Sequence, residues 1–230
     1  MPIQSGQPLY SIQRSLQKFS LLSAPILLVL SASPAFAHHA IGGETPTTVF
    51  EGLLAGLAHP VIGIDHFAFV IAVGLLASVT SQGVLSIAAF IVAALLGTVL
   101  HLASLNLPGV ELLISASVLL FGWLLAYKSM LPTWAIVGLA AIAGIFHGYA
   151  YGEAIIGAGM APLFSYLIGF SLTQLVIAVA AWSVGRALIN QSSETAITMS
   201  PLKTTGLILV GVGLSFLASE LINLALPQVA

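Results

Sequence analysis

The chain contains no cysteine, and only 5% of its 230 residues carry a charged side chain. Without cysteine, the protein has no disulfides, no thiolate metal ligands and no nucleophilic thiol. A soluble domain carries roughly a quarter charged residues, so the scarcity of charge excludes a large water-soluble core. Five basic residues form no basic patch, and nucleic acid is therefore not an expected partner.

Apolar residues make up 59% of the chain, and the mean hydropathy is +1.11. This composition predicts an all-α, polytopic membrane helix bundle that is surrounded by a lipid bilayer. A helix needs roughly 20 apolar residues to cross the hydrocarbon. On that scale the sequence predicts six transmembrane helices, near residues 50–78, 83–105, 110–127, 132–156, 161–188 and 203–225.

The first 37 residues have the pattern of a cleaved signal peptide. Arg14 and Lys18 precede a short apolar run, residues 19–30, and Ala35 and Ala37 fit the small-residue rule for cleavage. The apolar run is too short to span the ~30 Å of hydrocarbon. We therefore expect residues 1–37 to be removed and residues 38–230 to form one six-helix transmembrane domain.

The distribution of basic residues predicts the orientation. With the new amino terminus outside, six spans place both termini of the mature chain outside and three loops, near 79–82, 128–131 and 189–202, in the cytoplasm. Lys128, Arg186 and Lys203 lie in or beside these loops, as the positive-inside rule requires. The expected location is the plasma membrane.

Two imidazoles and a carboxylate occur within the first predicted span, in the segment 59–66 (HPVIGIDH). Ionisable groups at this depth are costly and are by default functional, although a structural polar knot between helices is the alternative. On a continuous helix His59 and His66 would share a face with Asp65 on its flank. Pro60 and Gly63 also favour a break in this helix.

Imidazole and carboxylate donors without thiolate suit Ni, Co, Zn or Fe(II) better than Mg, Ca or Cu(I). We therefore expect a divalent transition-metal ion as the partner of this segment. The ion is expected as a transported substrate, and no resident cofactor is predicted.

A second segment, residues 146–153 (FHGYAYGE), places His147 and Glu153 six residues apart, the spacing of His59 and Asp65. Gly148 and Gly152 form a small-xxx-small pair that permits close helix approach. The matched spacing raises the hypothesis of a three-plus-three inverted repeat.

Three further residues are candidate metal ligands. Glu111 begins the third predicted helix, where an acid is also explained as a cap that favours the helix dipole. His38 and His39 would follow the cleavage site and could chelate a metal together with the new amino group, or form a solvated, mobile terminus.

The segment 59–66, the segment 107–111 (LPGVE) and the pair Phe146-His147 followed by Gly148 resemble the HupE/UreJ family of nickel or cobalt permeases. The resemblance covers nearly the whole mature chain. It implies secondary uptake of Ni²⁺ or Co²⁺ across a bacterial membrane. It assigns the transport role to six residues: His59, Asp65, His66, Glu111, His147 and Glu153. The family often has a second histidine where this chain has Tyr151.

Two other functional classes stay open at the level of sequence. A membrane metal sensor or metallochaperone partner would bind the ion without flux. A haem or metal-binding redox protein could use the same histidines, although the dense histidine boxes of membrane oxygenases are absent. A membrane enzyme is not expected, because no serine-protease constellation stands out: Ser171 lacks the following glycine of the usual serine nucleophile motif.

Overall fold

The computed structural model describes residues 44–127, 131–191 and 200–226. The predicted signal peptide, His38, His39 and Lys128 lie outside these ranges. Within them every regular element is a helix, which confirms the predicted all-α class. The helices are α2 (Val49–Ile62), α3 (Ile64–Val79), α4 (Val84–Leu102), α5 (Val110–Ala126), α6 (Thr133–Glu153), α7 (Met160–Gln191) and α8 (Pro201–Ala225).

The first predicted helix is divided into α2 and α3, which are bent by 77° relative to each other. Gly63 joins them in an extended conformation, with φ −72° and ψ 100°. Pro60 lies in the last turn of α2 and cannot donate a helical hydrogen bond. The expected break is therefore present, and the expectation that His59, Asp65 and His66 lie on one continuous helix face is wrong.

Four helices, α4, α6, α7 and α8, are long and apolar enough to cross a membrane, and the bent pair of α2 and α3 counts as a fifth candidate if it forms one span. The apolar helix α5 is shorter, with 17 residues. The described chain is thus an integral membrane protein with four to five candidate spans. The six-span arrangement stays a prediction.

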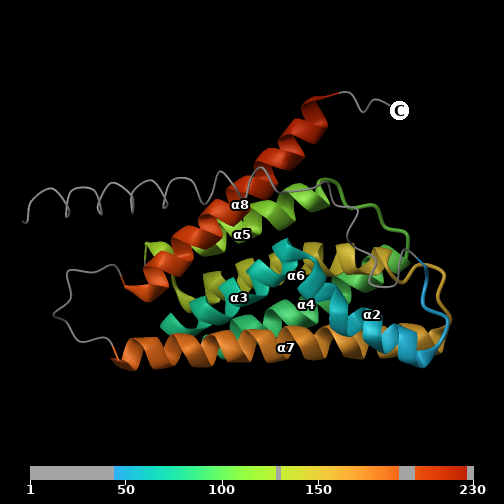
Figure 1. Ribbon diagram of the computed structural model, residues 1–230, viewed down its shortest axis with the longest axis horizontal. Helices are drawn as coiled ribbons and strands as arrows, with labels where there is room; N and C mark the ends of the chain where they lie inside the picture. The colour runs from blue at the N-terminus through green and yellow to red at the C-terminus, as the bar shows by residue number, and fades with distance from the viewer. Residues whose placement is uncertain (1–43, 128–130, 192–199, 227–230) are drawn as a thin grey trace, which may run out of the picture.

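Figure 1 shows α3 in the middle of the bundle, with successive helices from α3 to α8 running in opposite directions. The most extensive helix pairings are α4 with α6, α5 with α8, and α7 with both α2 and α3. The core around α3 is apolar, with Phe69, Phe90 and Phe121 fully or almost fully buried. This packing buries the α3 helix on nearly all sides.

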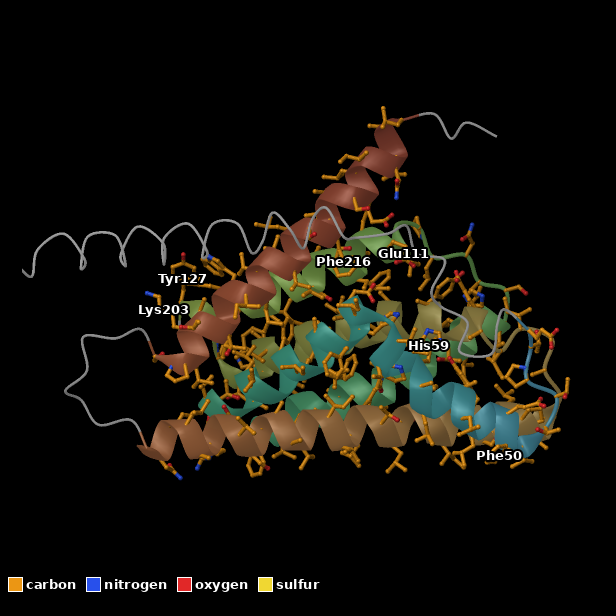
Figure 2. The ribbon with its side chains drawn as sticks, viewed as in Figure 1. Phe50, His59, Glu111, Tyr127, Lys203 and Phe216 are labelled. Atoms are coloured by element: carbon orange, nitrogen blue, oxygen red, sulfur yellow. The ribbon has the colours of Figure 1, made fainter. Side chains whose placement is uncertain are left out.

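The ends of α3, α5 and α7 meet the start of α8 at one end of the bundle. Val79, Tyr127, Arg186 and Lys203 all line an open cavity of about 860 Å³ there. In Figure 2, Tyr127 and Lys203 lie together at this end, whereas Phe50 lies at the opposite end and His59 is closer to Phe50. The described residues that flank the loops predicted to be cytoplasmic therefore share one end of the molecule.

Small residues allow α4 and α6 to pack closely. A side chain at Gly148 would collide with the backbone carbonyl of Ala94, and one at Gly152 would lie 2.6 Å from Cβ of His101. Thr98 uses this proximity, because its hydroxyl donates to the carbonyl of Gly148 at 2.7 Å. The predicted close approach at the glycine pair is confirmed.

The helix pairing agrees in part with an inverted repeat. Exchange of the two halves would relate α2 and α3 to α6, α4 to α7, and α5 to α8. The pairing of α4 with α6 then corresponds to that of α7 with α2 and α3, and the pairing of α5 with α6 corresponds to that of α8 with α3. Contact between α3 and α5 has no comparably extensive counterpart between α6 and α8 in the described ranges.

Candidate metal-binding site

Three histidines from three helices meet inside the bundle. His59 belongs to the last turn of α2, His66 to the beginning of α3, and His147 to the C-terminal half of α6. Their exposed fractions are 2%, 0% and 0%. The break at Gly63 turns α3 sharply away from α2, yet it keeps the first two imidazoles within 5.8 Å of each other, measured between ring centroids.

The contact between His66 and His147 is direct. Their Nδ1 atoms are 2.7 Å apart, which is a hydrogen bond between the two rings. On its other side His147 stacks on Phe69, with ring centroids 4.3 Å apart. Tight apolar packing therefore holds this pair of imidazoles in a fixed orientation.

Asp65 lies in the first turn of α3 and is 6% exposed. Its Oδ1 accepts the backbone N–H of His66 at 2.8 Å. The beginning of a helix stabilises an anion, because the unpaired N–H groups and the helix dipole point toward it. The break thus gives Asp65 a helix terminus inside the protein, which a continuous helix would not have provided.

Glu111 and Glu153 lie farther out. Glu153 is the exposed last residue of α6, and Glu111 is half-buried in the first turn of α5. The carboxylates of Asp65, Glu153 and Glu220 are close enough to Glu111 to repel its negative charge. These four acids come from four different helices, so the end of the site near Glu111 and Glu153 carries a concentration of negative charge.

In the described ranges, no three His, Asp or Glu side chains surround a single point closely enough to hold a metal ion. The structure brings together His59, His66 and His147, with Asp65 beside His66. It does not bring Glu111 or Glu153 into the same group. His38 and His39 lie outside the described residues.

Tyr151 of α6 lies between the two histidines of the first segment. Its ring centroid is 4.9 Å from that of His59 and 4.6 Å from that of His66. The side chain is fully buried. The phenol therefore packs on both imidazoles of the first segment.

Sequence reasoning did not single out three polar side chains that reach this site. Tyr166 of α7 contacts His59 with its hydroxyl, 2.9 Å from Nδ1, and Ser117 of α5 contacts His147, with 3.0 Å between Oγ and Nε2. Gln174 of α7 is fully buried and its amide faces the hydroxyl of Tyr151. Neither the amide of Gln174 nor the hydroxyl of Tyr151 forms a hydrogen bond of standard geometry within the described structure.

A signal for Gln174 was present in the sequence, because a buried amide inside an apolar span needs polar partners. Ser117 and Tyr166 gave no such signal. Serine and tyrosine are common in membrane helices, and only the fold shows that these two point at histidines.

Comparison with known proteins places these residues in a family. Residues 26–216 match the family model described as HupE / UreJ protein. The chain belongs to the HupE/UreJ family. It is also 31% identical over 154 residues to Protein HupE of Rhizobium leguminosarum bv. viciae, which covers 66% of this chain and 77% of that protein. No solved structure matches the chain.

The range matched by the HupE/UreJ model includes α2 to α7 and the first part of α8. All three buried histidines, Asp65, Glu111 and Glu153 fall inside it. The resemblance seen in the segments 59–66, 107–111 and 146–148 is thereby confirmed over most of the chain.

Proposed function

We propose that this HupE/UreJ protein is a permease that takes up Ni²⁺ or Co²⁺ across a bacterial membrane. Membership of the family and the membrane helices support transport of a metal ion. The observation that carries the proposal for this chain is the contact of His59, His66 and His147 in the protein interior, with Asp65 beside them. Buried ionisable groups in a span mark an ion pathway by default.

The donor atoms suit the proposed substrate. Imidazole nitrogens, a carboxylate and neutral oxygen donors favour the middle of the divalent first-row series over Mg²⁺, Ca²⁺ or Cu⁺. Tyr151 and Gln174 add a hydroxyl and an amide next to the two imidazoles of the first segment. These neutral groups can replace part of the hydration shell of the ion without adding charge.

The arrangement of ligands supports passage of the ion over retention. Glu111, Glu153 and Glu220 give the outer end a negative potential that raises the local cation concentration. In the described ranges no closed site of three charged or imidazole ligands traps the ion. Transport requires binding that is strong enough to admit the ion and weak enough to release it, so we propose exchange between several weak sites.

The proposed orientation has the acidic end outside and the end with Arg186 and Lys203 in the cytoplasm, in the inner membrane, with both termini of the mature chain outside. The shared position of Arg186 and Lys203 around one cavity supports this assignment, because basic residues are retained on the cytoplasmic side. Glu153 and Glu111 would then meet the ion first, followed by Asp65 and the histidines.

Uptake of radiolabelled Ni²⁺ and Co²⁺ tests the proposal, in cells that lack their own importers and at nanomolar metal. Asp65→Asn keeps the shape of the side chain and its acceptor for the N–H of His66, but removes the charge. We expect uptake by the wild-type protein and its loss in the variant at equal amounts in the membrane. Binding of the metal without any flux by the wild type would favour a sensor or chaperone partner, and a haem spectrum would favour a redox protein.

A further inference from the structure

A chain of hydrogen bonds leads from the buried imidazoles to a backbone carbonyl. Nδ1 of His66 contacts Nδ1 of His147 at 2.7 Å, and Nε2 of His147 contacts Oγ of Ser117 at 3.0 Å. The hydroxyl of Ser117 donates to the carbonyl oxygen of Ile114 at 2.6 Å. The carbonyl at the end of this chain can only accept, so it fixes the direction of every preceding bond.

The direction determines where each proton lies. Ser117 donates its single hydroxyl proton to the carbonyl of Ile114, so its oxygen can only accept from Nε2–H of His147. A neutral imidazole has one N–H and one lone pair, and Nδ1 of His147 is therefore the acceptor. His66 must donate from Nδ1–H, which leaves the lone pair of His66 on Nε2.

The same argument applies to His59. The hydroxyl of Tyr166 donates to the backbone carbonyl of Tyr151 at 2.8 Å, and its oxygen is 2.9 Å from Nδ1 of His59. Tyr166 has no second proton, so it accepts from Nδ1–H of His59. The lone pair of His59 is consequently also on Nε2.

We propose that Ser117, His147 and Tyr166 are positioning residues that hold His59 and His66 in the tautomer whose Nε2 atom binds the metal ion. The inference rests on the proposed function, because it takes the metal ion as the ligand. Imidazole binds a metal through its lone pair, and the hydrogen bond at the other nitrogen selects that atom. Both ring nitrogens of His147 are engaged in hydrogen bonds, so His147 acts through His66.

Ser117→Ala tests the direction of the first chain. Without the serine oxygen, Nε2–H of His147 loses its acceptor in a buried environment, which is costly. The proton of His147 then moves to Nδ1 and is donated to Nδ1 of His66, so the proton of His66 moves from Nδ1 to Nε2. We expect His66 to change tautomer and the affinity for Ni²⁺ to fall by about tenfold or more, as for other residues that orient metal ligands.

Two substitutions serve as matched controls. Ser117→Thr keeps a hydroxyl at the same position and should retain both the tautomer and the affinity. Ser115→Ala removes another buried serine of α5, two positions away and therefore on a different face of the helix. Tyr166→Phe, in contrast, removes the acceptor of His59 and should change the tautomer of His59 without changing that of His66.

The tautomers are read from the ¹⁵N resonances of the histidine rings in the full chain, reconstituted in lipid bilayers without metal, and affinity is measured separately with Ni²⁺ alone. Unchanged His66 resonances in Ser117→Ala, or an equal loss of affinity in Ser115→Ala, would overturn the proposal. Because the resonances are measured without metal or flux, failure of uptake with the expected tautomers would reject the permease and leave the hydrogen-bond assignment standing.

Discussion

The two histidine segments have the same spacing but different structures. In residues 59–66 the helix breaks at Gly63, and Asp65 is buried at the start of α3. In residues 146–153 the helix α6 is continuous, and Glu153 is exposed at its last residue. The comparison teaches that a six-residue separation places the acid inside the protein only where the backbone turns between the two residues.

The two segments also differ in what their histidines contact. His59 and His66 each use Nδ1 for a hydrogen bond to a neighbouring helix. His147 uses both nitrogens, one toward His66 and one toward Ser117. In the proposed mechanism, the broken segment presents the atoms that bind the ion, and the continuous segment supports them.

The largest expected effect comes from removing one acid of each segment in turn. Asp65→Asn should reduce Ni²⁺ uptake at least about a hundredfold, because a buried charge beside the imidazoles is lost. Glu153→Gln should reduce uptake only about threefold, because an exposed carboxylate is screened by salt. Uptake is compared at equal protein in the membrane, and equal losses in the two variants would abolish the distinction between the segments.

The break itself can be perturbed at Gly63. An added Cβ would lie 2.6 Å from Cδ2 of His66 and 3.2 Å from Oδ1 of Asp65, so Gly63→Ala should displace both side chains. We expect an affinity for Ni²⁺ about tenfold lower, measured by titration calorimetry.

The matched control is Gly138→Ala in α6. A Cβ at Gly138 would meet no described atom within 4 Å, and alanine favours a helix over glycine by roughly 1 kcal/mol. We expect unchanged affinity and unchanged or slightly higher thermal stability for this variant. A similar loss of affinity in both variants would show that the position of Gly63 next to His66 is irrelevant.

Tyr151 offers a smaller test, because it brings the continuous segment into contact with the broken one. Tyr151→His adds a third imidazole beside His59 and His66. The ion should bind more tightly and leave more slowly, so KM and the maximal rate of uptake should each fall by about threefold. A rise in the maximal rate would contradict the proposed exchange between weak sites.

The smallest expected effect concerns His38 and His39, which lie outside both segments. If they capture the ion, replacing both by alanine should lower uptake by about twofold at nanomolar metal and leave uptake at excess metal unchanged, because capture limits the rate only when the ion is scarce. Initial rates over a range of Ni²⁺ concentrations provide the measurement. An equal loss at every concentration would indicate a role in folding or insertion.

Much of the fold could be predicted from the sequence, because membrane helices are recognised by their long apolar runs. The ends of the helices from α4 to α8 lie within a few residues of the predicted ones. The break between α2 and α3 was also signalled, by Pro60 and Gly63. Its 77° angle was not, because the direction of a bend depends on the helices that pack on both sides.

The sequence alone determined the composition of the site: two imidazoles and an acid in one segment, an imidazole and an acid in another, and no sulfur ligand. These are properties of residue type and spacing, and local chemistry is sufficient to interpret them. Only the tertiary structure decided which of these groups meet. Ser117, Tyr166 and Gln174 come from other helices, and their roles depend on hydrogen bonds across helix interfaces, which residue spacing along one chain does not encode.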